Sequence, residues 1–339
     1  MTREYAQAGV DPKKITPFKR LMDEVAARTR TIPRERRQVY VYPNGAYAYH
    51  GRAAGHRWLG VTEGLGNKNW IAEWMYRMHR DVRWFSGIGF DTAMMAVVDV
   101  LREGFLPAVY SDEVAAGTSD WFTAIARASA IAESFEGACR VSGMALTSGE
   151  SPALRYLVKA ELPVADAPVL SGHVTAIATS DWRLIRGARY PGLVMLGAPS
   201  SGLHSNGISL VIKRALTLED EFLHIVPETG RMLGEEALIP TASYVRLMEV
   251  LLAAGVELMD VLPVTGDGVT KLFTSDPHPL TYRVTAWPAV PPLFRLSTYR
   301  SVNVIIDPPV NLTRRSYRDT HCLSIEKREV FYASLILIN

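Results

Sequence analysis

Two acidic residues in an apolar segment could hold a divalent metal ion. Asp91 and Asp99 lie within residues 90–104, and their separation is close to two turns of α-helix. A carboxylate on an apolar helix needs a compensating charge. Magnesium can supply that charge, because it prefers carboxylate and phosphate oxygens as ligands. The alternative is that Asp91 caps the N-terminus of the helix.

A second region, residues 198–207, has the composition of a loop that contacts a ligand. It consists mostly of small polar residues, with glycines, His204 and Asn206, and lies between two apolar runs. Glycine tolerates unusual backbone angles and leaves its N–H group unshielded. His204 and Asn206 could therefore bind an amide or a phosphate beside an accessible backbone. An ordinary turn between a strand and a helix is the alternative.

The segment Thr62-Glu63-Gly64-Leu65-Gly66-Asn67-Lys68 combines small residues with a carboxylate and an amine, and it follows a predicted strand. It lacks the Gly-Lys-Ser/Thr ending of a Walker phosphate loop. Taken alone, the segment is also compatible with a surface turn. Asp112 ends a later predicted strand, where aspartate is often a turn residue.

The elements that must position these residues follow from the hydrophobic pattern. Strands alternate over residues 38–62, with Asn44-Gly45 as a hairpin turn. The same pattern predicts helices over 17–38, 90–104, 120–141, 208–217 and 241–255, and strands over 107–115, 173–178 and 192–198. We expect an α/β (α+β) protein of two domains, residues 1–169 with a mixed sheet and residues 170–339.

Composition excludes several function classes. The chain has 339 residues and a net charge of +2, so nothing in its overall charge favours nucleic acid or an anionic membrane. No apolar run approaches the length of about 20 residues that a membrane span needs. The start of the chain lacks a signal-like apolar core, and two distant cysteines suit a reducing compartment. We expect a cytoplasmic protein.

The string Ser201-Gly202-Leu203-His204-Ser205-Asn206-Gly207 resembles the signature of the aminoimidazole ribonucleotide synthetase family, also called phosphoribosylformylglycinamidine cyclo-ligases. Other segments resemble the family in the same order along the chain, from about residue 5 to about residue 295. They are Tyr5 to Asp11, residues 62–68, Gly87 to Asp99, residues 106–113, Ser148 to Ser151, Ile239 to Tyr244, Thr265 to Gly268 and Trp287 to Phe294.

The resemblance implies ATP-dependent ring closure of formylglycinamidine ribonucleotide, with magnesium. It also implies a homodimer in which the N-terminal halves pair through their sheets, with ATP near the interface. By the same resemblance the nucleotide contacts are Lys68, Gly64, Gly66, Asp99 and Asp112; the metal ligands are Glu63, Asp91, Asp99 and Glu150; and the catalytic residues are His204, Asn206 and Glu150.

Several positions depart from the family pattern. Glu63 replaces an aspartate, Asn67 a threonine and Val98 an asparagine, and residues 297–339 have no counterpart and no glycine. We expect this tail to pack poorly. Two alternatives stay open: a related ATP-dependent kinase or synthetase of the same superfamily, and a non-catalytic nucleotide-binding paralogue.

Overall fold

A computed structural model describes the chain over residues 39–41, 49–53, 55–179, 184–185, 187–265, 272, 280, 282–284, 291–297, 310–312 and 332–338. The predicted helix over 17–38 and the turn at Asn44-Gly45 lie outside these residues.

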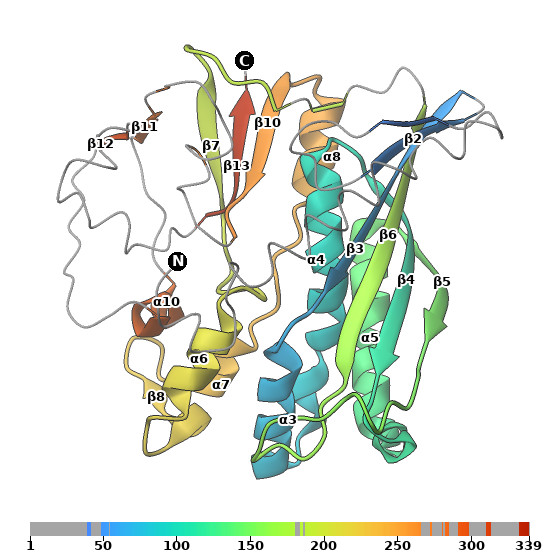
Figure 1. Ribbon diagram of the computed structural model, residues 1–339. Coiled ribbons are helices and arrows are strands. Elements are labelled where there is room, and N and C mark those ends of the chain that lie inside the picture. The colour runs from blue at the N-terminus through green and yellow to red at the C-terminus, as the bar shows by residue number, and fades with distance from the viewer. Residues whose placement is uncertain are drawn as a thin grey trace.

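A six-stranded mixed sheet forms the N-terminal half, in the order β1-β2-β3-β6-β4-β5 (Figure 1). Only β4 and β5 run parallel, and the other neighbours are antiparallel. The strands are β1 (Val39–Val41), β2 (Tyr49–Ala53), β3 (His56–Gly64), β4 (Pro107–Ala115), β5 (Ala145–Glu150) and β6 (Val169–Thr179).

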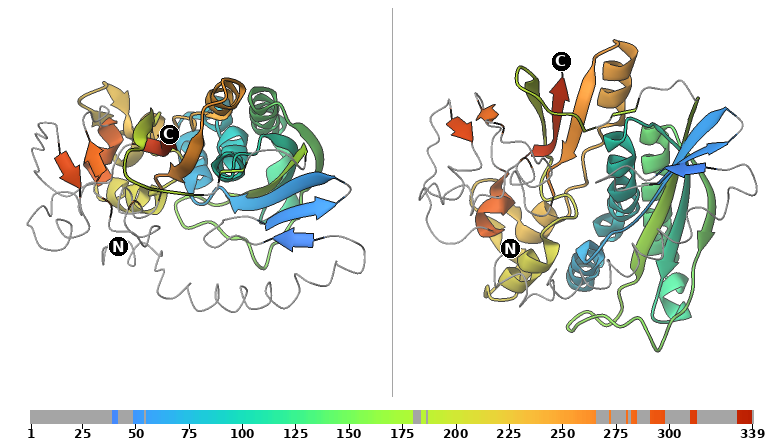
Figure 2. Two further views of the ribbon diagram at one scale, coloured as in Figure 1. Left: turned by 90° about the horizontal axis from the view of Figure 1, so that it is seen from above. Right: turned by 45° about the horizontal axis from the view of Figure 1, so that its top comes forward.

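Helices cover one face of this sheet, as the view from above shows (Figure 2). Alternate strand residues such as Leu59 and Val61 of β3 and Leu170 and Val174 of β6 are buried, because they face the helices. The helical elements of this half are α3 (Lys68–His79), η2 (Val82–Phe85), α4 (Ile88–Arg102), η3 (Ser119–Thr123) and α5 (Ile125–Ser142).

A smaller three-stranded sheet, in the order β10-β13-β7, organises the C-terminal half. Its helices α6 and α7 lie near α3, and α8 packs against α4 and α5 (Figure 1). The elements are β7 (Val194–Pro199), α6 (Ile208–Ala215), η4 (Glu221–Leu223), β8 (Ile225–Val226), β9 (Arg231–Met232), α7 (Leu233–Ala237), α8 (Val245–Ala253), β10 (Leu258–Pro263), β11 (Tyr282–Val284), α10 (Pro292–Ser297), β12 (Val310–Leu312) and β13 (Tyr332–Ile338).

The mixed α/β class predicted from the sequence is confirmed, and the predicted strand over 107–115 coincides with β4. The structure differs from the expected domain boundary at residues 169–170. Strand β6 begins at Val169 and pairs with both β3 and β4, so it lies in the middle of the first sheet. The first sheet therefore continues to Thr179.

The tail also differs from expectation where the structure describes it. The backbone of β13 pairs antiparallel with β10 on one side and with β7 on the other. Residues 332–338 are thus the central strand of the second sheet rather than a poorly packed extension. Residues 298–309 and 313–331 of the tail lie outside the described residues.

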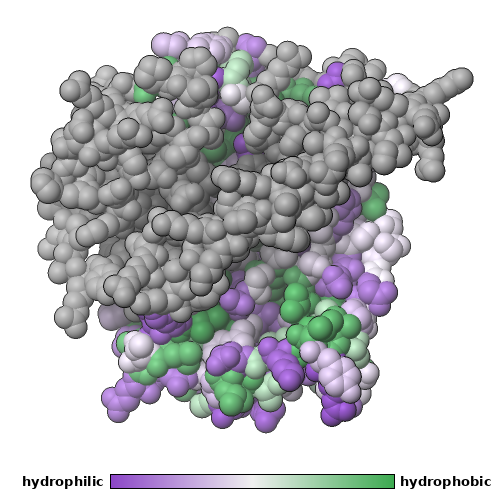
Figure 3. Space-filling view, viewed as in Figure 1, coloured by the Kyte–Doolittle hydropathy of each residue, from purple (hydrophilic) through white to green (hydrophobic). Residues whose placement is uncertain are grey.

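Within the described part of the chain, one helical stretch, Val82–Arg102, has the length and hydropathy of a membrane span. In the most apolar part of this stretch, 72% is buried inside the protein, as is typical of a core helix. On the face seen in Figure 3, apolar and polar side chains alternate over the described surface.

Candidate functional site

An ion pair joins the first turns of two helices inside the protein. Lys68 is the first residue of α3, and Asp91 lies in the first turn of α4. The Nζ atom of Lys68 is 2.7 Å from Oδ2 of Asp91, and both side chains are fully buried. Lys68 also donates a hydrogen bond of 2.8 Å to the carbonyl oxygen of Ile239. Burial lowers the pKa of Lys68, and the attraction of Asp91 opposes this shift.

Thr241 binds the other oxygen of the same carboxylate. Its backbone N–H and its hydroxyl donate to Oδ1 of Asp91 over 2.7 Å and 2.6 Å. Asp91 therefore does not act as a local helix cap, although it lies in the first turn. Its partners are a lysine of α3 and a threonine from the C-terminal half.

His204 lies in the turn after β7 with a left-handed backbone, at φ 56°. Its Nε2 atom lies 3.0 Å from Oγ of Ser200, and it accepts from the backbone N–H groups of Ser201 and Ala242 over 3.3 Å and 3.4 Å. Burial, with a smaller contribution from the charge of Lys68, lowers the pKa of His204 to about 4. The imidazole is therefore neutral at pH 7, with Nε2 engaged as an acceptor.

Three of the predicted segments meet at the boundary between the two halves. Nδ2 of Asn67 donates to Oγ of Ser209 over 2.8 Å, which joins the 62–68 loop to the start of α6. Oγ of Ser201 donates to the carbonyl oxygen of Pro240 over 2.7 Å. The loop, the 198–207 turn and residues 239–242 therefore form one connected site. Asn206 is half-buried in it, and its backbone N–H donates to Leu203.

Three of the other predicted carboxylates, those of Glu63, Asp112 and Glu150, lie at one end of the first sheet. Glu63 and Asp112 both pair with Gly172, from opposite sides, so they share a row across β3, β6 and β4. Glu150 pairs with Glu113 in the next row. Gly149 leaves room for Asp112, because a Cβ atom there would lie 2.5 Å from its Oδ1. Burial raises the pKa of Asp112.

The predicted four-carboxylate metal site is not assembled. Among the residues described here, no group of three or more His, Cys, Asp or Glu side chains is placed to share a metal ion. Asp91 is paired with Lys68 away from the sheet edge, Asp99 is half-buried further along α4, and Glu150 is exposed with its carboxylate on the N–H of Ser151. Lys68, a nucleotide contact by the family resemblance, has its side chain fully buried.

Sequence reasoning missed two polar residues of these regions. Thr241 was noted only as part of a motif, and its link to Asp91 spans 150 positions. Tyr110 is fully buried, and its hydroxyl has no hydrogen-bond partner among the residues that the structure describes. A Cβ atom on Gly172 would lie 2.0 Å from that hydroxyl, so glycine is required beneath it. Burial next to Asp112 raises the pKa of Tyr110. No local sequence signal indicated the Thr241–Asp91 contact or the burial of Tyr110.

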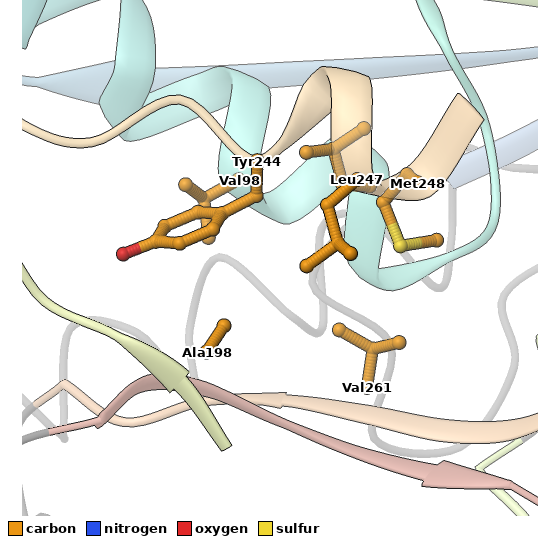
Figure 4. A pocket seen from close by; sticks show the side chains of 7 residues that line it. Val98, Ala198, Tyr244, Leu247, Met248 and Val261 are labelled. Carbon is orange, nitrogen blue, oxygen red and sulfur yellow. The ribbon is translucent and has the colours of Figure 1, made fainter. Parts of the chain in front are cut away.

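A small apolar cavity lies beside the site, between α4, α8 and the second sheet (Figure 4). Val98 lines it, at the position where the family pattern has asparagine. Tyr244 also lines it, and its hydroxyl donates to the carbonyl oxygen of Pro199 over 2.8 Å. The hydrophobic substitution at residue 98 is thus accommodated by an apolar environment. The lining residues are Val98, Leu101, Ala198, Tyr244, Leu247, Met248 and Val261.

The fold is that of thiamine-monophosphate kinase. The crystal structure of this kinase from Aquifex aeolicus matches 85% of the chain, and the chain matches 81% of the kinase, with a TM-score of 0.50 and 12% sequence identity. Identity at this level shows a shared fold only. No protein-family model matches the sequence.

Sequence relatives are more specific. The phosphoribosylformylglycinamidine cyclo-ligase of Limosilactobacillus reuteri is 36% identical over 55% of this chain and 50% of its own length. The enzyme of the same name from Lactobacillus helveticus is 31% identical over 69% of this chain and 63% of its own length. The chain thus matches between half and two thirds of these curated relatives. The resemblance to cyclo-ligases that the motifs indicated is confirmed.

Proposed function

We propose that the protein is an ATP-dependent cyclo-ligase that converts formylglycinamidine ribonucleotide into aminoimidazole ribonucleotide in purine biosynthesis. The observation that carries the proposal is the Asn67–Ser209 hydrogen bond, which joins the 62–68 loop to the start of α6, directly after the Ser201–Gly207 string. Both segments are among those that resemble the cyclo-ligases. The sequence similarity to enzymes with that name supports the same activity.

The proposed reaction moves one oxygen atom. The amide oxygen of the formyl group attacks the γ-phosphorus of ATP, and ADP leaves. The neighbouring amidine nitrogen then attacks the activated formyl carbon and closes the ring. The carbon–oxygen bond breaks, protons leave the nitrogen, and phosphate carries the former formyl oxygen. The protein must hold the two groups together and exclude water that would hydrolyse the activated amide.

The residues of the chain divide between these tasks. The turn with His204 and Asn206 binds the substrate amide or its phosphate, with His204 as a neutral group because its pKa is about 4. Gly64 and Gly66 bring the backbone of the 62–68 loop close to the nucleotide phosphates. Lys68 offsets their charge from behind this loop.

The carboxylates at the ends of β3 and β4 are suited to bind magnesium, whereas Asp91 is not. Magnesium is typically bound through one or two carboxylates together with substrate phosphates, and it neutralises phosphate charge. Glu63 and Asp112, in one row across Gly172, offer such a pair, whereas Glu150 lies in the next row, where side chains point to the opposite face of the sheet. Both oxygens of Asp91 are occupied by Lys68 and Thr241. Asp99 remains a candidate for the nucleotide.

Phosphoryl transfer by a related ATP-dependent kinase or synthetase of the same superfamily is the second candidate. A kinase would leave the phosphoryl group on its acceptor and release no inorganic phosphate. The third candidate is a non-catalytic nucleotide-binding protein, because a buried Lys68–Asp91 ion pair is also compatible with a purely structural role. We further propose that the protein acts in the cytoplasm as a homodimer.

The test is an assay of the purified full chain with magnesium and ATP. ADP should be released only when formylglycinamidine ribonucleotide is present, together with equimolar phosphate and aminoimidazole ribonucleotide. Release of ADP without phosphate would instead support a kinase. Absence of any ADP, despite ATP binding by calorimetry, would support the non-catalytic alternative.

A further inference from the structure

Thr241 connects two parts of the chain that are far apart in sequence. It donates both its backbone N–H and its hydroxyl to one oxygen of Asp91, whose other oxygen pairs with Lys68. All three residues are buried. A buried carboxylate is stable only when its hydrogen-bonding capacity is filled. The loss of either partner, Lys68 or Thr241, would therefore weaken the hold of Asp91 on the other.

The segment that contains Thr241 is also held from its other side. Lys68 donates to the carbonyl oxygen of Ile239, and Ser201 donates to that of Pro240. The N–H of Ala242 donates to Nε2 of His204. Residues 239–242 therefore lie between the start of α3 and the turn that carries the signature string.

We propose that Thr241 is a positioning residue: through Asp91 it holds the Lys68 ammonium in place behind the 62–68 loop, and it aligns that loop with the 201–207 turn. This deepens the proposed function, because it rests on Lys68 and the 62–68 loop serving the nucleotide. Thr241 itself touches neither reacting group. It acts because Asp91 can orient Lys68 only when its own second oxygen is fixed.

The variant Thr241→Val isolates this role. Valine has nearly the shape of threonine and keeps the backbone N–H, so only the hydroxyl donor to Asp91 is lost. Thr92→Val is the matched control. Thr92 is fully buried in α4 beside Asp91, and its hydroxyl donates to the carbonyl oxygen of Ile88 over 2.7 Å. Each variant therefore loses one buried hydroxyl hydrogen bond in the same part of the protein.

The readout is the rate at which Lys68 is reductively methylated in the full chain without nucleotide, measured by peptide mass spectrometry. We expect Lys68 to react at least about tenfold faster in Thr241→Val than in wild type, the scale of one hydrogen bond to a charged group. Thr92→Val should react like wild type, and Thr241→Ser should restore protection. Equal rates in Thr241→Val and Thr92→Val would overturn the proposal.

One measurement on wild type keeps the proposal testable if Thr241→Val does not fold. The amide hydrogen of Thr241 should exchange as slowly as the core amides of α4, and exchange within seconds would contradict the proposal. Where Thr241→Val folds, calorimetry with ATP separates the positioning role from the proposed function. ATP binding that is weakened in Thr241→Val alone supports both. A wild type that does not bind ATP contradicts the proposed function and the nucleotide role of Thr241, even where Lys68 is held as described.

Discussion

The ammonium of Lys68 and the carboxylate of Asp91 lie 2.7 Å apart, and neither side chain is exposed to solvent. The pair joins the first turn of α3 to the first turn of α4 and is closed from the other half of the chain by Ile239 and Thr241. Lys68 is therefore part of the packing of the molecule as well as a candidate for phosphate binding. Substitution of Lys68 should therefore lower the stability of the fold even when no nucleotide is bound.

Replacing Lys68 with methionine should lower the free energy of unfolding by about 3–5 kcal/mol, because it leaves Asp91 charged and buried without its cation. Urea unfolding in the absence of nucleotide measures the loss. The double variant Lys68→Met/Asp91→Asn removes both charges and should recover part of the loss. A single variant as stable as wild type would contradict the buried pair.

Acidification should destabilise the protein through His204. The pKa of this imidazole is about 4 in the folded state against 6.5 as its usual value, so the unfolded chain binds the proton more readily. Stability from His204 is present above pH 6.5 and is lost as the pH falls towards 4, by on the order of 3 kcal/mol. Unfolding of wild type and His204→Gln across this pH range measures the difference. A similar slope in both proteins would show that His204 is not held as an acceptor.

Glu150→Gln should reduce magnesium-dependent ATP turnover by about two orders of magnitude or more, the usual scale for a group that stabilises charge at a reaction centre. Glu150 is exposed at the end of β5, so the fold itself should be unaffected. Glu133→Gln, an exposed carboxylate on α5, is the control and should keep wild-type turnover. Unchanged turnover in Glu150→Gln would remove this residue from the site.

Leu335→Pro should unfold the second sheet. The backbone of residue 335 lies between Leu262 of β10 and Gly197 of β7, and proline cannot donate a hydrogen bond within a central strand. Strand β7 leads directly into the turn with His204, so substrate binding should be lost as well. Leu335→Val keeps the N–H group and should behave like wild type. Circular dichroism and limited proteolysis distinguish the two outcomes. A stable Leu335→Pro variant would mean that β13 is dispensable.

The sequence predicted elements better than the contacts between them. The bounds of strand β4 were predicted correctly because a short run of strand-forming residues that follows a glycine-containing turn is a local signal. The position of β6 in the first sheet was not predicted, because strand order depends on pairing with distant segments. Likewise, the carboxylate of Asp91 was recognised as needing a partner. The chosen partner, Lys68, and the second donor, Thr241, became known only from the folded chain, since nothing local distinguishes an ion pair from a metal ligand.

The central claim, ring closure through a phosphorylated amide oxygen, is tested most directly with formylglycinamidine ribonucleotide that carries ¹⁸O in its formyl group. The purified full chain is incubated with this substrate, magnesium and unlabelled ATP, and the released phosphate is analysed by mass spectrometry. The account predicts one ¹⁸O atom in each phosphate, formed together with aminoimidazole ribonucleotide. Phosphate without the label, or ATP consumption without the cyclised product, would contradict it.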